Sequence, residues 1–417
     1  MTRVRLPVIV AALAAGCWAA LVAQRMDAFV ESRHHPAIAY GRGPIDTPIA
    51  TLNERLAAGQ ARLPFDPQTG YLKATLAALD ISPDSQVLVY SPTSFQASKI
   101  TQQNPRAIYF NDTVAVGWIR GADLLEVTAQ DPRHGTIFYT LGQTPADMPQ
   151  FNRQEQCVSC HLTWDTLGVP GLTVKTTFPR KAPGEFLNGG PVDHRRPMAE
   201  RWSGWFVTGA RVPPLHMGNR PLIQPTPLEG TAPALTTVDG QFDTTGYLRT
   251  TSDVVALMLL EHQTQAANLM TRLNWEARLG DAARTHVAAE TLADYLLFVG
   301  EAPITGGIEG TPAFAAAFAA RGPRDATGRS LRDLQLQGRM MRYPLSYMIY
   351  SPMFDGLPQP ARELVESRLA DVLSGRETAI RYAHLSAADR RSILDILHST
   401  RPGLAMPSRV AEPHDRR

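Results

Sequence analysis

The spacing of hydrophobic side chains changes twice along this chain of 417 residues, and each change predicts a different kind of structure. Residues 48–80 carry leucine and isoleucine at helical spacing in two segments, which predicts two short helices. From Gln86 to just before Gln143, short β-branched and aromatic runs alternate with turn sequences, which predicts an antiparallel β meander. From Ser252 the helical spacing returns in longer segments, so the C-terminal half is predicted to be a helical bundle.

Particular residues predict where some of these elements begin or turn. Asn111 and Asp112 separate two β runs and indicate a tight hairpin. Ser252 is expected to cap the first long helix, and Ser386 with Asp389 resembles a capping box at the start of the last one. Residues 334–350 are also expected to be helical.

A stretch rich in Gly and Pro, ending at about Thr250, separates the meander from the helices. Such length without regular structure is uncommon in a compact domain unless the segment wraps a ligand. The patterns together predict an α+β fold, in which a small antiparallel β meander is followed by a ligand-binding loop region and a mainly α-helical C-terminal half. The predicted division is residues 1–24 as an export segment, 25–145 as N-terminal helices plus meander, and 146–417 as the ligand-binding, mainly helical domain.

The N-terminus predicts export. Arg3 and Arg5 precede an uncharged apolar run at residues 6–23, which is typical of a secretory signal peptide or of an uncleaved signal anchor. Cys17 lies in a sequence that resembles a lipoprotein box, so lipidation is a third alternative. We therefore expect a periplasmic or otherwise extracytoplasmic protein, either free or anchored to the inner membrane by residues 6–23.

Composition argues against both a nucleic-acid partner and a disulfide-stabilised fold for this chain. The formal net charge is +2 at pH 7, which gives no broad basic field, so we expect no nucleic-acid partner. The chain has three cysteines, so its fold cannot depend on a disulfide framework.

The candidate chemistry lies in Cys157, Cys160 and His161, which form the pattern C-x-x-C-H. Two thiols at this spacing share one side of a helical turn and can each form a thioether with a haem vinyl group, while the histidine ligates the iron. A zinc site would need a second ligand pair, a thioredoxin-like dithiol should follow a strand in a βαβ unit, and a structural disulfide is the remaining alternative. The motif predicts one covalently attached haem c, with His161 as the proximal iron ligand.

The second axial ligand decides between electron transfer and chemistry at an open iron, and the sequence leaves it open. Met217 is our candidate metal ligand because a thioether raises the haem potential, and His216 beside it is an alternative. His194 lies in a similar loop, and His262 lies on an apolar helix where a core histidine is the usual interpretation. Later methionines that could line a haem pocket are Met340, Met341, Met348, Met353 and Met406.

Haem propionates need cations and hydrogen-bond donors. Arg201, Trp202 and Trp205 could supply guanidinium and indole N–H groups, although the sequence slightly favours a strand with two partly buried tryptophans and an exposed arginine. Arg195, Arg196 and Arg342 are further candidates.

Seven stretches resemble a broad family of exported bacterial proteins that are described only as containing a cytochrome c domain. They are PRAIYFNDTVAVGWI, CVSCH, DHRRPMAERWSGWFVTG, LHMGN, SDVVALMLLEHQ, RYPLSYMIYSP and LSAADRRSILDIL. The resemblance implies haem binding and electron transfer in an elaborated cytochrome c domain. The chain is longer than a small cytochrome c, and its single C-x-x-C-H distinguishes it from di-haem peroxidases.

The sequence thus favours an exported mono-haem cytochrome that transfers single electrons to or from an unidentified redox partner protein. A peroxidase-like enzyme with an open or displaceable distal ligand is the first alternative, since an electron carrier needs neither the chain length nor the long loops. The second alternative is a haem-bearing sensor or interaction module, in which the meander binds the partner.

Overall fold

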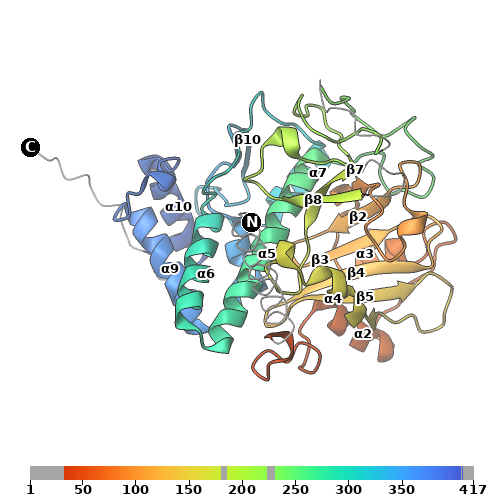
Figure 1. The fold of residues 1–417 in the computed structure, drawn as a ribbon, viewed down its shortest axis with the longest axis horizontal. Helices are drawn as coiled ribbons and strands as arrows, with labels where there is room; N and C mark the ends of the chain where they lie inside the picture. Colours follow the sequence, from red (N-terminus) through yellow and green to blue (C-terminus); the bar gives the residue numbers. More distant parts are fainter. Residues whose placement is uncertain (1–31, 180–185, 223–230, 405, 407–417) are drawn as a thin grey trace, which may run out of the picture.

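The computed structural model describes residues 32–179, 186–222, 231–404 and 406, and it has an α+β fold with two lobes (Figure 1). A seven-stranded, wholly antiparallel sheet forms the first lobe, with the strand order β6-β5-β4-β3-β2-β1-β9. Its strands are β1 (Val87–Val89), β2 (Arg106–Phe110), β3 (Val114–Trp118), β4 (Leu124–Asp131), β5 (Gly135–Gly142), β6 (Asn152–Arg153) and β9 (Trp205–Phe206).

The predicted meander is confirmed as β1 to β5, and the alternation along its strands explains which face is buried. In β4, Leu125, Val127 and Ala129 are buried in one core, while the residues between them are only partly buried. Helices α2 (Pro48–Ala57) and α3 (Leu72–Ala78) pack into that core, which confirms the two predicted short helices. We call the opposite side of the sheet, part of which packs into the core of the helical lobe, the outward face.

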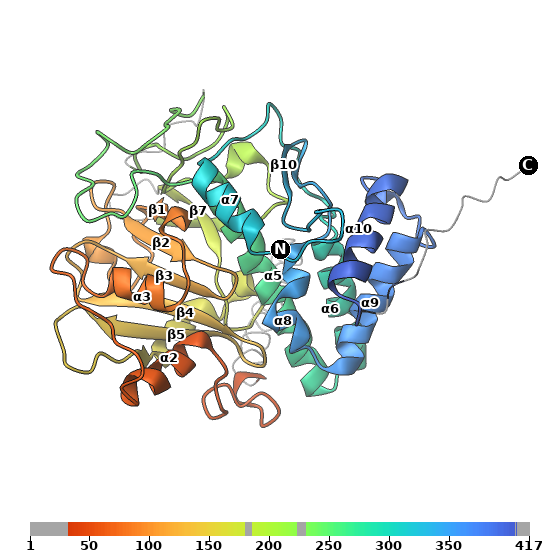
Figure 2. The same ribbon diagram turned by 180° about the vertical axis from the view of Figure 1, so that it is seen from behind.

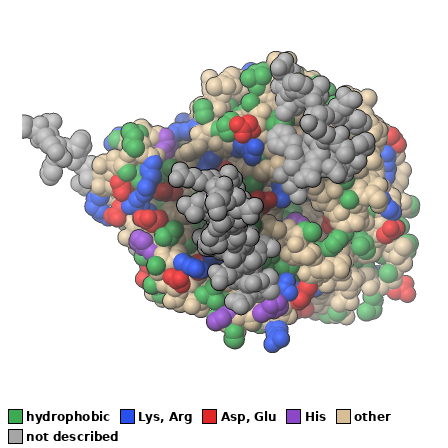
Figure 3. All heavy atoms as spheres, in the orientation of Figure 1, with side chains coloured by type: hydrophobic (Ala, Val, Ile, Leu, Met, Phe, Trp, Pro, Cys, Tyr) green, Lys and Arg blue, Asp and Glu red, His purple; other side chains and the backbone are tan. Residues whose placement is uncertain are grey.

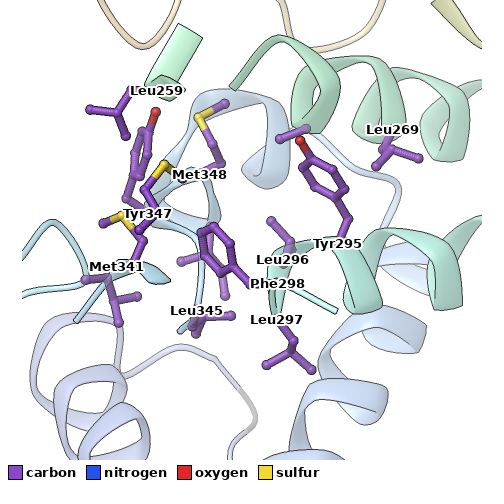
Figure 4. Close-up of a cluster of buried hydrophobic side chains, with 14 of the residues drawn as sticks. Leu259, Leu269, Tyr295, Leu296, Leu297, Phe298, Met341, Leu345, Tyr347 and Met348 are labelled. Carbon is purple, nitrogen blue, oxygen red and sulfur yellow. The ribbon is translucent and has the colours of Figure 1, made fainter. Parts of the chain in front are cut away.

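The second lobe is helical and packs around α5 (Val254–Leu279), which lies between the sheet and the other helices (Figures 1 and 2). A separate core fills this lobe, and Figure 4 shows part of it, where Met341 and Met348 lie among aromatic and leucine side chains. The remaining α-helices of this lobe are α6 (Ala282–Leu296), α7 (Pro312–Ala320), α8 (Pro352–Asp355), α9 (Gln359–Ser374) and α10 (Ala387–Thr400).

Short elements lie within and between the two lobes. Two hairpins pair β7 (Val174–Pro179) with β8 (Phe186–Val192), and β10 (Leu334–Gln337) with β11 (Arg339–Met341). Single turns of helix are α4 (Val158–His161), η1 (Pro83–Ser85), η2 (Ala97–Lys99), η3 (Glu155–Cys157), η4 (Trp164–Thr166), η5 (Met198–Glu200), η6 (Tyr347–Tyr350) and η7 (Ile380–Tyr382).

Two local predictions are confirmed. Asn111 forms the turn between β2 and β3, where its side-chain oxygen accepts hydrogen bonds from the backbone N–H groups of Thr113 and Val114. Ser386 and Asp389 form the full capping box at the start of α10.

Other predictions are wrong. The cap of α5 is Asp253 instead of Ser252, because the Asp253 carboxylate accepts hydrogen bonds from two backbone N–H groups of the first turn. The hydroxyl of Ser252 instead donates to the Phe206 carbonyl and accepts from the Leu88 N–H, which ties α5 to the sheet. Residues 334–350 form the β10–β11 hairpin and a short helix, because Gly338 turns the chain with φ 79°.

The finer prediction of an elaborated cytochrome c domain is also wrong, because an antiparallel sheet with helices on both sides is not a cytochrome c fold. The sheet also continues beyond residue 145, since β6 pairs with β5 and β9 pairs with β1. The C-x-x-C-H segment therefore follows an edge strand of the sheet.

The predicted export segment at residues 1–24 lies outside the described residues. Within the described ranges, none of the helices combines the length and the apolar character needed to cross a membrane.

Candidate functional site

The C-x-x-C-H segment is held against the outward face of the sheet by the strand that precedes it. The Gln154 backbone N–H donates to the Phe138 carbonyl at 2.9 Å, and its side-chain amide donates to the Thr140 hydroxyl at 2.9 Å. The chain then turns through η3 into α4, so Cys157, Cys160 and His161 lie within about one and a half helical turns, as their spacing predicts. Figure 1 shows α4 in front of the sheet.

The two cysteines of the motif are free thiols in different environments. Cys160 is exposed, whereas Cys157 is half-buried and packs against the hydrophobic cluster that includes Phe138 and Val158. Burial raises the pKa of Cys157 to about 11, and the negative charge of Glu126 acts in the same direction. A dithiol redox site lowers the pKa of its attacking cysteine instead. The motif also follows an edge strand of an antiparallel sheet and not a strand of a βαβ unit, so both observations argue against a thioredoxin-like role.

His161 is held at one ring nitrogen. Its Nδ1 lies 3.0 Å from the Gly171 carbonyl oxygen, and the Gly171 N–H donates in return to the His161 carbonyl at 2.9 Å. This pair of contacts places the imidazole proton on Nδ1, because a carbonyl can only accept. Among the described residues no group hydrogen-bonds to Nε2. A histidine ligand to a metal is normally oriented in this way, with the other ring N–H donated to a backbone carbonyl.

Packing fixes the plane of the His161 ring. The ring lies on Phe138, with 4.9 Å between the ring centres and an angle of 42° between the planes. Burial lowers the pKa of His161, and this effect exceeds that of the Gly171 carbonyl, which raises it. His161 is therefore neutral near pH 7, which is the state that can ligate a metal.

The loop between His161 and Gly171 is supported from α5. The Asn268 side-chain amide donates to the Leu172 carbonyl at 2.8 Å, and its oxygen lies so close to Gly171 that a Cβ there would approach it to 2.1 Å. Gly171 is thus required by close packing. Because α5 fixes this loop, it also fixes the carbonyl that orients His161.

Three charged residues that the sequence interpretation missed lie near the motif. Arg106 of β2 and Glu126 of β4 form an ion pair of 3.1 Å, and Lys175 of β7 pairs with Asp165 at 2.7 Å. The charges of Arg106, Glu126 and Lys175 all act on the pKa of His161. No local sequence signal marks them, because Arg106 and Glu126 meet through the pairing of β2, β3 and β4, and Lys175 comes from the separate β7–β8 hairpin.

Met217, the predicted distal ligand, is buried, and its contacts are with other elements. Its sulfur accepts a hydrogen bond of 3.7 Å from the Thr176 hydroxyl, and its backbone N–H donates to the Arg201 carbonyl. His216 next to it is buried against Trp202, and its Nδ1 accepts from the Gly218 N–H at 3.0 Å. No recorded contact joins either residue to His161 in the described parts of the chain, so ligation by Met217 stays a prediction.

His194 and His262 contact each other instead of a shared metal. Their Nδ1 atoms lie 2.9 Å apart, and His262 Nε2 lies 2.6 Å from the Ser346 hydroxyl. Both rings are buried with Tyr295 and Phe298, and burial lowers the pKa of His262 to about 3. The usual interpretation of His262 as a core histidine fits this geometry.

The later methionines belong to the helical lobe. Met340, Met341, Met348 and Met353 are buried in its core, and Met406 packs on that core from outside. Within the described residues, none of these methionines contacts the C-x-x-C-H segment, so the structure gives no support for any of them as an iron ligand.

Most of the predicted propionate partners already form ion pairs or hydrogen bonds with Asp or Glu side chains. Arg201 and Trp202 are fully buried and both donate to Glu261, with an Arg201–Glu261 distance of 3.1 Å. Arg195 pairs with Asp193, and the indole of Trp205 donates to the Lys175 carbonyl. Arg196 lies 3.4 Å from Glu200, and the exposed Arg342 lines an open cavity of about 430 Å³ beside α7.

The side chains near Cys157, Cys160 and His161 decide whether this site could hold a bare metal ion or a haem. Within the described ranges, no group of three or more His, Cys, Asp or Glu side chains is arranged to hold a metal ion by itself. His161 alone would not retain iron, whereas two thioether bonds beside it would. The residues present therefore fit a covalently attached haem on its proximal side.

Comparison with known proteins gives no family and no relative: no protein-family model, curated protein or solved structure matches this chain.

Proposed function

We propose that the protein is an exported mono-haem c-type cytochrome that transfers single electrons. Cys157 and Cys160 hold the haem, and His161 ligates its iron. The observation that carries the proposal is the paired contact between His161 and Gly171, which holds Nδ1 and leaves Nε2 without a hydrogen-bond partner among the described residues.

Attachment consumes the two thiols without an oxidant. Each S–H adds across a vinyl double bond, so the sulfur bonds to one carbon and the proton goes to the other. Both cysteines are free, and the partial exposure of the α4 turn leaves Cys160 accessible for this addition. Haem supplies a one-electron couple between ferric and ferrous iron.

The chain's own residues hold the ligand in place. Phe138 supports the His161 ring, Gly171 accepts its Nδ1–H, and Asn268 supports that loop from α5. A hydrogen bond from Nδ1–H to a carbonyl also makes Nε2 a better donor to a metal. These contacts support a ligand that keeps its position in both oxidation states.

Export belongs to the same proposal. Covalent haem attachment of this kind in bacteria takes place outside the cytoplasm, and the apolar run at residues 6–23 after Arg3 and Arg5 is typical of an export signal. We place the protein in the periplasm, either free or anchored to the inner membrane by that run.

The test is expression of the full chain in a bacterial host that carries a haem-attachment system. We expect one haem to remain bound through denaturation, and a mass increase that is lost in the Cys157→Ser/Cys160→Ser variant. His161→Ala should change the oxidised and reduced absorption spectra, while His286→Ala, at an exposed site on α6, should leave them unchanged. A wild-type protein that carries no covalent haem under these conditions would overturn the proposal.

A second function, peroxide turnover, is supported by one observation. Four sequence candidates for the second axial ligand, His194, His216, Met217 and His262, are buried and already engaged by other protein groups. An iron without a protein ligand on that side binds CO when reduced and can react with peroxide. CO binding with peroxide turnover above that of free haem would favour the enzyme, and a six-coordinate spectrum unchanged by CO would favour the electron carrier.

A further inference from the structure

The outward face of the sheet beside the motif carries a patch that we define by Arg106, Gly117 and Glu126. Gly117 of β3 pairs in register with Glu126 of β4, and its other neighbour is β2, where Arg106 lies. The Arg106–Glu126 ion pair of 3.1 Å thus passes over the position where Gly117 has no side chain. A Cβ on Gly117 would meet Arg106 Cδ at 3.4 Å and Glu126 Cβ at 3.7 Å, so the three residues are in contact.

The patch faces the motif. Glu126 pairs with Thr140 and Thr128 pairs with Phe138, so Phe138 and Glu126 lie on the same face of neighbouring strands. Phe138 is the residue on which His161 packs, and the Glu126 charge acts on Cys157. The motif therefore lies over β5, with the patch beside it on β2 to β4.

Arg106 has hydrogen-bonding capacity that the fold does not use. Its Nε–H is buried and has no hydrogen-bond partner, and its recorded ion pair is the one with Glu126. Glu126, by contrast, also accepts from the Ser94 hydroxyl and the Gln96 amide. A guanidinium with a spare donor beside a candidate haem site is suited to a carboxylate, because Arg binds carboxylates with paired hydrogen bonds.

We propose that the haem packs against the patch around Gly117 and that Arg106 binds one of its propionates. This inference rests on the proposed function. Because Gly117 has no side chain, the Arg106–Glu126 pair lies close to the sheet, and the haem would contact this ion pair and not the Gly117 backbone. Lys175, whose charge also acts on His161, lies on β7 near the same site and is half-buried beside Asp165. The proposed site thus combines a low ion pair, seated over Gly117, with a guanidinium that can reach a propionate.

The proposal makes the haem potential sensitive to both charges of the patch, with opposite signs. A positive charge near the haem favours the reduced state, which is less positive by one charge. Arg106→Gln should raise the oxidised-to-reduced ratio about tenfold at a fixed ambient potential, which corresponds to about 59 mV for a one-electron couple. Glu126→Gln should shift the ratio the other way, and Arg106→Lys should stay close to wild type.

Gly117→Leu tests the packing part of the proposal. The glycine is not in a left-handed conformation, so leucine adds bulk without backbone strain. The matched control is Gly142→Leu in β5, where a new Cβ would meet nothing within 4 Å. We expect the circular dichroism of the haem Soret band to change in Gly117→Leu and not in Gly142→Leu.

The measurements separate this inference from the function on which it rests. Mass spectrometry on the wild-type chain tests haem attachment, and potentiometric titration of each holoprotein tests the patch. Suppose that haem is attached, but that Arg106→Gln and Glu126→Gln each change the oxidised-to-reduced ratio at a fixed potential by less than twofold. The patch is then not the haem site, and the proposed function still stands. A general loss of folding cannot imitate the expected result, because it would not shift the two potentials in opposite directions.

Discussion

His161 and the buried pair of His194 and His262 are histidine sites of opposite design. His262 has both ring nitrogens hydrogen-bonded, to His194 and to Ser346, and its side chain is fully buried. His161 has one nitrogen held by Gly171, is half-buried, and lies within one turn of two free thiols. His262 is thus held by the core at both ring nitrogens, whereas His161 is only half-buried and has one ring nitrogen oriented by a carbonyl, as in a metal-ligating histidine. His194 also has a ring nitrogen, Nε2, without a hydrogen-bond partner, but that atom is buried in the core. The two sites therefore differ in burial and in the neighbouring thiols, and an unpaired ring nitrogen alone does not distinguish them.

The largest expected effect concerns the buried charge beside the histidine pair. Glu261→Ala removes the carboxylate that Arg201 and Trp202 share, and it leaves a buried guanidinium without its counter-ion. We expect a loss of about 4 kcal/mol in the free energy of unfolding, measured by urea denaturation. A loss below about 1 kcal/mol would mean that the network is not structural.

Truncating one histidine from each site tests the comparison directly. His262→Ala should destabilise the apoprotein by about 3 kcal/mol, because it opens a cavity and removes the partners of His194 and Ser346. His161→Ala should cost about 1 kcal/mol, since the ring is half-buried and makes one hydrogen bond. The contrast fails if urea denaturation of the two apoproteins gives equal losses.

Gly171→Ala tests whether the loop that contains Gly171 orients His161. A Cβ there would approach the Asn268 side-chain oxygen to 2.1 Å, so the loop or α5 must move. We expect a loss of about 2 kcal/mol in stability and a changed absorption spectrum in the holoprotein. Gly142→Ala is the control and should change neither, because a Cβ there meets nothing within 4 Å.

The last expected effect is a slope and not a fixed loss: it is the pH dependence of stability. Burial lowers the pKa of His262 to about 3 and holds that of His194 well below its ordinary value, so the unfolded chain binds protons that the folded chain does not. Stability contributed by these neutral rings is complete above the unfolded pKa of about 6.5 and falls as the pH decreases, by at most about 1.4 kcal/mol per pH unit for each ring.

Comparison with His262→Gln isolates this contribution. Glu261 works in the opposite sense, since burial raises its pKa to about 7, but it is present in both proteins. Unfolding free energies measured between pH 4 and pH 7 should fall less steeply in the variant. Equal slopes in the two proteins would show that the buried pair does not govern the acid sensitivity.

The sequence predicted those parts of the molecule that local patterns determine. The meander, the two N-terminal helices and the Ser386 capping box all depend on residues close together in the chain. Residues 334–350 contain apolar residues at helical spacing, and this pattern predicted a helix. The alternation at Leu334 and Leu336 and the turn at Gly338 instead produce a hairpin. The cap at Asp253 was missed because Ser252, one residue earlier, has an equally suitable side chain that the sheet engages.

The candidate site divides in the same way. Cys157, Cys160 and His161 form a local motif, so the sequence could name them. Arg106 and Glu126 meet only through the pairing of β2, β3 and β4, and Gly171 acquires its role from Asn268 on α5, 97 positions later. Sequence-distant pairs of this kind leave no periodic signal.

The position of β6 and β9 at the two edges of the sheet has a consequence for how the chain matures. Strands β1 to β5 pair in chain order, so they can assemble while the chain is still emerging N-terminus first. The thiols follow β6 immediately, whereas β9 and then α5 arrive from residue 205 onward. In an exported chain, an attachment enzyme would therefore meet Cys157 and Cys160 on a formed sheet, before α5 supplies Asn268 and fixes the loop that orients His161.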